Sequence, residues 1–353
     1  MLDKRLTEHV LTIGPAPDMK GGIAQVINTY FSDIFSSPKF IAEIVNGGTA
    51  KRMATSVGAA FKLINRLNSD KSIRIVHLHT AAKVSFPRSA IYAKIAKMLG
   101  RKVVMHVHGS TFEAYFNRNK RRVRKTLQNC DAVVALSQSW LDFFKTEVGL
   151  DNVVILPNIV SEADVPAEQP VADSLTHLLF LGELGPRKGV YDLLDAVYDS
   201  RETLAGRVML HIGGNGDTQK LEDTINRLGL DGIVRFEGWV SGEKKKELLR
   251  QCSIYVLPSY AEGLPISILE AMAYSHAIIS TTVGGIPEVV DSTNGILVEP
   301  GDKKALAQAI CTLAADPDKV KAMGVQSLSK VKPHFSSEVA NELSQLYQRL
   351  LSE

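Results

Sequence analysis

Short apolar runs alternate with longer amphipathic stretches along the whole chain. The first half contains apolar runs short enough to be buried strands at 9–14, 73–79, 103–109, 132–137 and 153–158. More follow in the second half, at 177–182, 207–214, 233–240, 252–259, 277–285 and 295–300. Strands that alternate with helices are typical of parallel α/β sheets. The hydrophobic pattern therefore predicts two successive α/β segments.

The segment between these two series reads as a linker. Residues 161–174 are rich in proline, alanine and acidic side chains and show no periodicity. With 353 residues, the chain is longer than one hydrophobic core usually serves. We therefore expect two doubly wound domains of similar size, over 1–165 and 166–335, that face each other across a cleft. An amphipathic helix over 336–353 is expected to cross back to the first domain.

Composition narrows the class of protein. Apolar residues make up 45% of the chain and charged residues 22%, as in ordinary globular enzymes, so disordered and fibrous classes are excluded. No apolar stretch reaches membrane-spanning length, and the first ten residues lack the apolar core of a signal peptide. The three cysteines are scattered and form no CxxC pair, which is typical of reduced core thiols. We expect a cytoplasmic protein.

The formal net charge of +3 conceals a strong asymmetry between the two halves. Residues 1–160 contain 23 Lys and Arg against 11 Asp and Glu, a balance of +12. Residues 161–353 contain 18 against 27, a balance of −9. Such a division predicts an anionic partner for the first half alone.

Basic residues gather at 118–125 and along 85–102, where Phe86, Ile91 and Tyr92 interleave with the cations. A basic amphipathic helix suits an anionic membrane surface, which would place the protein peripherally on the inner face of the cytoplasmic membrane. An ordinary solvated helix face is the alternative. Nucleic acid is not expected as a partner, because no nucleic-acid-binding module is present and the other half is acidic.

A pair of glutamates marks the second half. Glu262 would lie on the loop after the strand at 252–259, and Glu270 about one turn into the following helix. In an open parallel sheet, ligands bind at this edge, outside the carboxyl ends of the strands. Two acceptor-only carboxylates suit a polyhydroxylated ligand, because each can accept bonds from neighbouring hydroxyls. The competing interpretation is that Glu262 caps the helix and Glu270 is solvated.

Two loops have the composition of phosphate sites. Gly21 and Gly22 lie between the first strand and a helix, where a phosphate could reach backbone N–H groups and the positive end of that helix. A tight strand-to-helix turn explains these glycines equally well. Arg187 and Lys188 follow the second half's first strand in a Gly/Pro loop, which is the placement expected of a diphosphate clamp. A solvated surface pair is the alternative there.

Histidines gather at the ends of two first-half strands. His108 ends a strand, where its ring could form hydrogen bonds in a cleft, whereas His77, His79 and His106 could equally be core or supporting residues. No acidic residue that could act as a third metal ligand is evident near these HxH pairs. The DxD sequence at 316–318 reads as a helix end followed by a proline turn. No metal site is expected.

Residues 255–309 closely resemble the donor-binding half of family-4 retaining glycosyltransferases, which have the GT-B fold of two Rossmann-like domains. The specific part is a pair of glutamates separated by seven residues and followed by GG-x-PE. The resemblance extends to FLGELGPRKG, LHIGGNGD and VRFEGWVS in the second half, and to IVHLH, HVHGS and LPNIV in the first. Many members carry EGFGLP where this chain has EGLPIS, a departure in the loop that presents backbone N–H groups.

The resemblance implies a role for each candidate residue. Glu262 would hold the hydroxyls of the donor sugar, Glu270 would hold the ribose diol, and His108 would face the transferred sugar. Arg187 and Lys188 would bind the diphosphate, together with N–H groups at Gly22 and at the start of the helix after Glu262. The expected site thus has His108 and Glu262 in catalysis, and donor-binding residues Gly21, Gly22, Arg187, Lys188, Gly263, Leu264 and Glu270. No metal and no cofactor would be needed, because cations and helix-terminal N–H groups would stabilise the leaving group.

The expected activity is retaining transfer of a hexose-type sugar from a nucleoside diphosphate, with UDP as the expected nucleotide, to a saccharide acceptor. The basic first half suggests an acceptor carried on a lipid diphosphate such as undecaprenyl diphosphate, as in bacterial surface polysaccharide biosynthesis. The alternatives are a small soluble acceptor, or a non-catalytic nucleotide-sugar-binding partner of a synthase complex.

Overall fold

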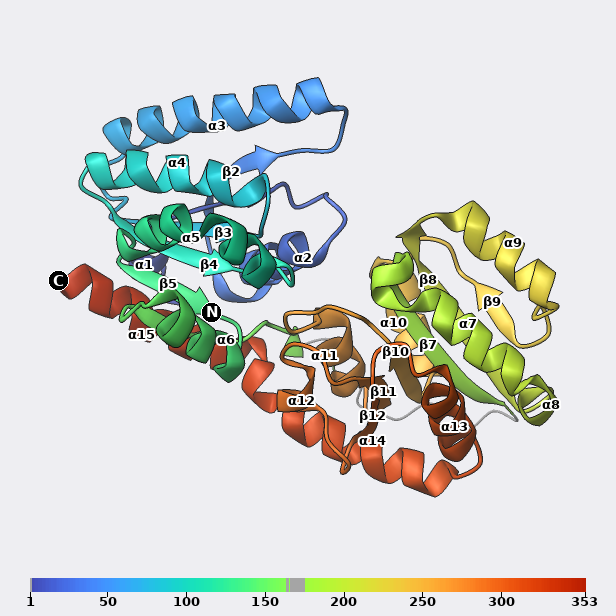
Figure 1. Cartoon of the computed structure of the whole chain (residues 1–353). Helices are drawn as coiled ribbons and strands as arrows, with labels where there is room; N and C mark the ends of the chain where they lie inside the picture. The colour runs from blue at the N-terminus through green and yellow to red at the C-terminus, as the bar shows by residue number, and fades with distance from the viewer. Residues whose placement is uncertain (1, 163–164, 166–174) are drawn as a thin grey trace. The chain divides into compact units, whose positions relative to one another are not determined.

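The computed structural model describes residues 2–162, 165 and 175–353, and it divides the chain into two compact units (Figure 1). The first unit contains Met1–Glu162 and Pro333–Glu353, and the second contains Ala163–Lys332. Most of the linker expected at 161–174, and the expected domain boundary between 165 and 166, lie outside the described residues.

The first unit is built on a six-stranded parallel sheet. Its strand order is β2-β1-β3-β4-β5-β6, and every neighbouring pair is parallel. The strands are β1 (Val10–Pro15), β2 (Lys39–Ile44), β3 (Ile75–Thr80), β4 (Lys102–Val107), β5 (Ala132–Ala135) and β6 (Val153–Ile155). The helices are α1 (Lys4–Thr7), α2 (Gly22–Thr29), α3 (Thr49–Ser69), α4 (Ser85–Met98), α5 (Phe112–Gln128), α6 (Gln138–Phe143) and α15 (Ser336–Ser352). Single π-helical turns follow α2 at η1 (Tyr30–Ile34) and α6 at η2 (Phe144–Val148).

Alternation along the central strands divides their side chains between two different environments. On one face, Val76 and Leu78 of β3 join the apolar core under α3, α4 and α5. On the other face, His77 and His79 point toward aromatic residues of η1 and α15, including Tyr30 and Tyr347. This division follows from the two-residue period of a strand, in which successive side chains point to opposite faces of the sheet.

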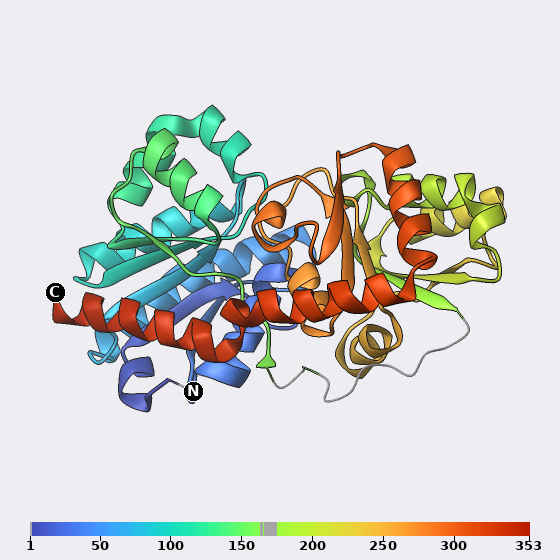
Figure 2. The ribbon, with the colours of Figure 1, turned by 90° about the horizontal axis from the view of Figure 1, so that it is seen from below.

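Helix α15 completes the first unit from the far end of the sequence. In Figure 2 the red helix α15 lies across the strands of this unit. The backbone N–H of Val160 donates to the carbonyl of His334 at 2.9 Å, which ties the segment after β6 to the chain just before α15. The Tyr347 ring stacks on Phe35 with centroids 6.5 Å apart, and its hydroxyl bonds to His77 Nδ1 at 2.6 Å.

The second unit repeats the architecture with its own parallel sheet, in the order β12-β11-β10-β7-β8-β9. Its strands are β7 (Thr176–Leu184), β8 (Val208–Gly216), β9 (Val234–Phe236), β10 (Ile254–Leu257), β11 (Ala277–Thr281) and β12 (Gly295–Val298). Its helices are α7 (Val190–Asp199), α8 (Arg201–Leu204), α9 (Thr218–Leu228), α10 (Gly242–Gln251), α11 (Ile266–Ala273), α12 (Ile286–Val289), α13 (Lys303–Ala314) and α14 (Pro317–Val331). The expected pair of doubly wound parallel sheets is confirmed.

Each sheet reverses its strand order at one point. In the second unit the chain moves outward from β7 through β8 and β9, then returns to place β10 on the other side of β7. In the first unit the reversal falls between β1 and β3. Loops on either side of such a point part from each other at the carboxyl ends of the strands, and ligands of open α/β sheets bind in the resulting crevice.

One sequence expectation needs correction. Phe86 and Tyr92, expected to interleave with cations on an exposed helix face, are buried in the core under α3 and α4, whereas Ile91 is exposed. The Tyr92 hydroxyl donates to the carbonyl of Ser56 in α3, which holds the two helices together. Within the described residues, no helix has the length and apolarity needed to cross a bilayer.

Candidate functional site

The basic loop after β7 is held tightly against the end of β10. Residues Pro186–Lys188 form a single 3₁₀ turn, η4, that ends at Gly189 with a φ of +69°. A Cβ atom at Gly189 would lie 2.0 Å from the carbonyl oxygen of Pro258, so only glycine allows the approach. The N–H of Tyr260 donates to the carbonyl of Arg187 at 2.8 Å. These contacts place both cations of the turn beside the loop that carries Glu262.

Lys188, Arg187 and Glu262 meet at the β7/β10 reversal point. Lys188 Nζ lies 2.6 Å from Glu262 Oε1, and the two side chains are 13% and 7% exposed. Arg187 Nη1 is 3.9 Å from the same oxygen, while Nη2 donates to Glu183 at 2.9 Å. Glu262 therefore holds the lysine directly and the arginine at longer range, and Glu183 was not singled out from the sequence.

The loop after Glu262 rests on a second glycine turn. Gly284, with a φ of +59°, lies so close that a Cβ atom there would be 2.1 Å from the Glu262 carbonyl oxygen. The N–H of Gly285 donates to the carbonyl of Gly263 at 2.6 Å. Gly263 and Leu264 are buried and lead directly into α11, which begins at Ile266. The first N–H groups of a helix lack partners within the helix and give it a positive end, so this loop opens onto a favourable place for an anion.

Glu270 lies farther along α11 and has a lysine partner from another helix. Its Oε1 is 2.5 Å from Lys245 Nζ in α10, and both side chains are largely buried. Lys245 stands in the run GEKKKELL, which reads as a solvated helix surface. No sequence signal separates Lys245 from its neighbouring lysines, so this contact became visible only in the structure.

In the first unit, the candidate residues lie at the ends of β1 and β4. Helix α2 begins at Gly22, and Gly21 before it has a φ of +138°; both glycines are exposed. His108 follows β4 directly and donates its backbone N–H to the carbonyl of Thr80 at 2.8 Å. Gly21 and Gly22 thus lie beside the reversal point of this sheet, after β1.

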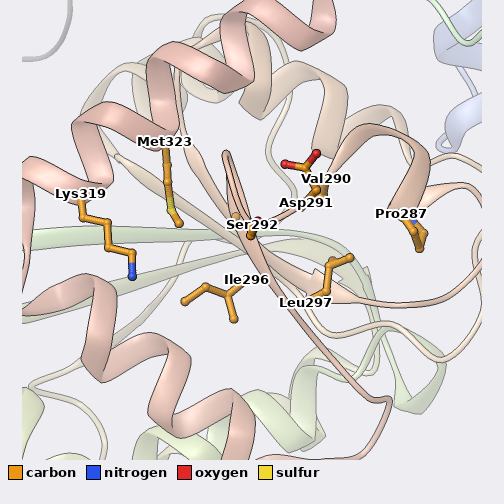
Figure 3. Close-up of a pocket in the computed structure, with 9 residues that line it drawn as sticks. Pro287, Val290, Asp291, Ser292, Ile296, Leu297, Lys319 and Met323 are labelled. Carbon is orange, nitrogen blue, oxygen red and sulfur yellow. The ribbon is translucent and has the colours of Figure 1, made fainter.

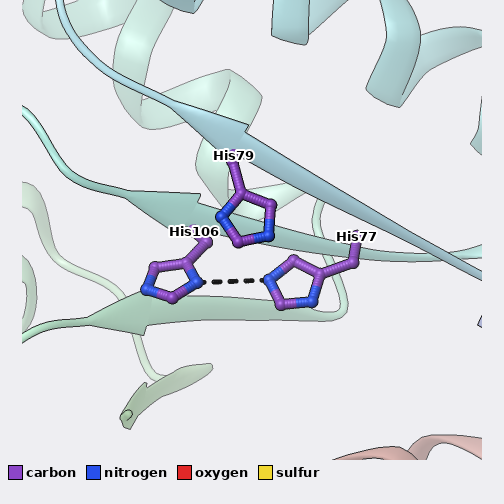
Figure 4. A group of neighbouring side chains, drawn as sticks. All are labelled: His77, His79 and His106. Carbon is purple, nitrogen blue, oxygen red and sulfur yellow. Dashed lines mark hydrogen bonds between the residues drawn. The ribbon is translucent and has the colours of Figure 1, made fainter. Parts of the chain in front are cut away.

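The His108 ring is the outermost member of a group of four stacked imidazoles. Its Nε2 lies 3.0 Å from His79 Nδ1, and the nearby Asn158 side chain partly offsets the lowering of the ring's pKa by burial. Deeper in the sheet, His77 Nε2 lies 3.3 Å from His106 Nδ1, as the dashed line in Figure 4 shows. Burial lowers the pKa of all four rings, including His108 with its partly exposed edge, and keeps them neutral.

Three of these histidines lie close enough together to raise the question of a metal site. One ring nitrogen from each of His77, His79 and His106 lies within 4.8 Å of the others. The rings, however, are stacked: His77 and His79 have centroids 4.5 Å apart and planes 16° apart. Imidazoles that share a metal ion direct their in-plane lone pairs at one point, whereas stacked planes direct them past one another. The arrangement favours hydrogen-bonded neutral rings.

Asn158 connects this group to the chain that leads into α15. Its carbonyl oxygen lies 2.9 Å from His334 Nδ1, and both residues are buried. Asn158 lies in LPNIV, but its spacing from His108 gives no local sign that the two side chains meet. The DxD sequence at 316–318 has a structural role, because Asp316 caps α14 by accepting the N–H of Lys319 at 3.0 Å.

A hollow of about 570 Å³ lies elsewhere in the second unit (Figure 3). It is lined by residues of α12, β12 and α14 and the turn between the first two, namely Pro287, Val290, Asp291, Ser292, Gly295, Ile296, Leu297, Lys319 and Met323. Asp291 already pairs with Lys330. The hollow contains no residue of the candidate site and no convergent set of polar groups, so we do not assign it to donor binding.

Comparisons with known proteins agree on one family. A model described as Glycosyltransferase Family 4 matches residues 37–163, and one described as Glycosyl transferases group 1 matches residues 176–316. Alpha-maltose-1-phosphate synthase of Mycolicibacterium smegmatis is 28% identical over 262 residues, covering 64% of this chain and 65% of that protein. The putative colanic acid biosynthesis glycosyltransferase WcaL of Escherichia coli is 26% identical over 214 residues, covering 58% and 50%. The D-inositol 3-phosphate glycosyltransferase of Streptomyces griseus is 29% identical over 185 residues, covering 50% and 39%. The matched part thus spans less than two thirds of each of these three relatives.

Solved structures share the architecture of the whole chain. HepE of Anabaena, solved in complex with UDP, superposes with a TM-score of 0.76 at 17% identity, covering 96% of this chain and 99% of that one. Sucrose-phosphate synthase of Thermosynechococcus elongatus gives a TM-score of 0.77 at 17% identity, covering 98% and 99%. At such identities the likeness concerns the fold, and it confirms the two-domain Rossmann-like GT-B architecture.

Proposed function

Because the chain belongs to the family-4 glycosyltransferases of the GT-B fold, we propose that it transfers a hexose-type sugar from UDP to a saccharide acceptor with retained anomeric configuration. The observation that carries the proposal is the meeting of Lys188, Arg187 and Glu262 at the strand-order reversal of the second unit. It combines a carboxylate for sugar hydroxyls with two cations for a diphosphate.

The chemistry at this place follows from what a departing nucleotide needs. When the bond between the anomeric carbon and the diphosphate oxygen breaks, negative charge collects on that oxygen. Lys188, Arg187 and the N–H groups at the start of α11 would stabilise this charge. The acceptor hydroxyl attacks from the face the nucleotide leaves and passes its proton to the departing phosphate oxygen. Glu262 would keep its contact with Lys188 while its other oxygen accepts a sugar hydroxyl.

The remaining residues take supporting roles in the proposal. Glu270 would accept hydrogen bonds from the ribose diol, with Lys245 fixing the orientation of its carboxylate. Gly263 and Leu264 would present backbone N–H groups to the donor, and Gly21 and Gly22 would admit phosphate to the start of α2. His108, neutral because of its burial, would face the transferred sugar. We propose no metal and no cofactor.

For the acceptor, we propose a lipid-linked saccharide in bacterial surface polysaccharide biosynthesis, reached from the cytoplasmic face of the membrane. The +12 balance of residues 1–160 supports an anionic surface as partner. The similarity to a colanic acid biosynthesis glycosyltransferase points the same way. A small soluble acceptor is the second candidate, because two relatives are named for maltose 1-phosphate and inositol 3-phosphate products or substrates.

The function is tested by offering the protein a panel of nucleotide sugars and measuring release of free nucleotide, with and without EDTA. We expect release from one UDP-sugar, and we expect it to persist in the chelator. Absence of release from every donor would favour a non-catalytic binding protein. Activity that is lost in EDTA and restored by Mg²⁺ would overturn the metal-independent mechanism.

The clamp itself is tested by calorimetry with UDP. Charge-assisted hydrogen bonds contribute about 1.5–3 kcal/mol each, so Arg187→Ala with Lys188→Ala should weaken UDP binding by at least about tenfold. Lys304→Ala, an exposed lysine on α13, is the matched control and should bind UDP normally. Equal UDP affinities in the two variants would show that this loop does not bind the diphosphate.

A further inference from the structure

Helix α3 carries an apolar stripe that the fold leaves uncovered. Met53, Val57, Phe61 and Ile64 are between 38% and 69% exposed. Their spacing of four, four and three residues places them along one side of the helix. The side that packs on the sheet is formed by other residues, Ala59, Leu63 and Leu67, which are fully buried. Helix α3 therefore has a second apolar side in addition to the one that folding uses.

Cations border this stripe and acids are absent from the helix. Between residues 49 and 69 the chain has Lys51, Arg52, Lys62 and Arg66 and no Asp or Glu. Across the described residues, no ion pair joins Lys51, Arg52 or Lys62 to a carboxylate. An apolar stripe with unpaired cations beside it is the pattern of a helix that lies in the interface of an anionic bilayer.

The neighbouring helix α4 extends the pattern. Val84, just before α4, and Ile91 and Met98 within it are spaced seven residues apart and are each more than half exposed. Helices α3 and α4 pack against each other, and Figure 1 shows them side by side over the sheet. Residues 49–102 contain twelve Lys and Arg and one acid, Asp70. Some of these cations pair within the fold, as Arg88 does with Glu43.

Helix α5 differs from α3, because it has the basic charge but no large exposed apolar side chains that could insert into a bilayer. It carries the basic run at 118–125, but its large apolar residues Phe112, Phe116, Val123 and Leu127 are buried in the core. Helix α5 can therefore attract an anionic surface without inserting anything into it. Helix α3 has both the charge and the exposed apolar side chains.

We propose that α3, assisted by α4, is the element that docks the first unit on an anionic lipid surface, with Met53, Val57 and Phe61 inserted among the lipid headgroups. The proposal rests on the lipid-linked acceptor proposed above and names the surface that would reach it. A second copy of the chain fits the same stripe less well, because two such surfaces would bring their unpaired cations together. Lipid headgroups of negative charge complement them.

The test uses the full chain and sedimentation with phosphatidylcholine vesicles, with and without phosphatidylglycerol. The wild-type protein should pellet with the anionic vesicles only. Replacing Met53, Val57 and Phe61 by Ser should weaken this binding by about tenfold or more, because the apolar contribution to interfacial binding scales with buried apolar area. Val325→Ser, an exposed apolar position on α14, should bind as the wild type does.

Salt separates the two contributions. Charge reversal in α5, Arg121→Glu with Arg122→Glu, should weaken binding at low salt and matter little at high salt, where surface charges are screened. The α3 triple variant should bind vesicles weakly at both low and high salt. Unchanged vesicle binding by the triple variant, or no wild-type binding to anionic vesicles, would overturn the proposal. A triple variant that instead loses self-association would assign the stripe to a second copy.

The failure of docking and the failure of the proposed function are distinguishable. The α3 triple variant keeps every residue of the candidate site, so its UDP affinity and nucleotide release should equal those of the wild type, which also reports an intact fold. If the wild-type protein releases nucleotide normally but does not bind vesicles, the proposed transfer reaction stands and the proposed docking on a lipid surface is wrong.

Discussion

Three buried histidines, His77, His79 and His106, couple the stability of the first unit to pH. Burial, with a smaller contribution from neighbouring rings, lowers the pKa of His77 to about 3 and holds the others well below their usual value. The unfolded chain takes up these protons near pH 6.5, as free histidine side chains do. The folded state therefore binds fewer protons than the unfolded state in the window between. Their stabilising contribution is fully present above about pH 6.5 and is lost as the pH falls toward 3.

We predict that the free energy of unfolding of the first unit falls between pH 7 and pH 5, by up to about 1.4 kcal/mol per pH unit for each histidine that must stay neutral. Urea unfolding of a Trp239→Phe variant measures this, because Trp140 in the first unit then remains as the only tryptophan. His106→Gln should make the pH dependence shallower by about one proton. An equally steep slope with and without His106→Gln would contradict the assignment.

At the scale of single elements, the turn η4 depends on one glycine. Gly189→Ala would force a Cβ atom against the Pro258 carbonyl at a φ of +69°, so the turn must move away from β10. We predict a loss of about 1–3 kcal/mol in stability and weaker UDP binding, because Lys188 moves with the turn. Thermal unfolding and calorimetry measure the two effects.

Gly185→Ala is the matched control for this substitution. Gly185 lies in the same loop, has extended backbone with a φ of −167°, and has open space where a Cβ atom would be placed. Its replacement should change stability by no more than about 0.5 kcal/mol. Similar losses at 185 and 189 would show that the loop as a whole, and not the close approach to Pro258, sets the geometry.

Most elements could be predicted from the sequence, because a buried parallel strand is a short apolar run that needs no partner to be recognised. Strand β2 (Lys39–Ile44) was not predicted, because it lies at the sheet edge, where β1 is its only partner among the described strands, and because it includes charged residues. Phe86 and Tyr92 were misplaced because apolar residues occupy several sides of α4, and tertiary packing alone decides which side is buried.

The candidate site could be predicted only where a loop pattern marks it. Arg187, Lys188 and Glu262 each follow a predicted strand, but their meeting depends on β7 and β10 being neighbours, a strand order that no local pattern contains. Lys245 gave no signal at all, because its partner Glu270 is 25 residues away on another helix. Long-range pairs of this kind follow from topology.

At the scale of the whole molecule, the first unit depends on residues from both ends of the described chain. Helix α15 covers the sheet face that carries His77, through Tyr347 above all. Tyr347→Ala should destabilise the first unit by about 3 kcal/mol or more, as expected when a fully buried aromatic side chain is removed. Gln348→Ala, at the exposed neighbouring position, is the control and should be nearly neutral.

The measurement is urea unfolding followed by Trp140, with UDP calorimetry on the folded variants as a second readout. We expect Tyr347→Ala to shift the Trp140 transition while UDP affinity is retained. The reason is that Arg187, Lys188 and Glu262, which carry the proposed donor site, belong to the second unit. A shift of similar size for Gln348→Ala would mean that α15 contributes as a whole helix and not through Tyr347.

The contribution of residues 333–353 to the first unit has a consequence for the order in which the protein is made. A ribosome delivers 1–162 first, then all of 163–332, and only afterwards the segment that covers the histidine face of the first sheet. During that interval all residues of the second unit have been synthesised. In the first unit, Tyr347 has not yet been synthesised and cannot pack against Tyr30 and His77. The nascent first unit would therefore be a substrate for chaperones throughout synthesis of the second. The unit that is translated first is the last to be completed.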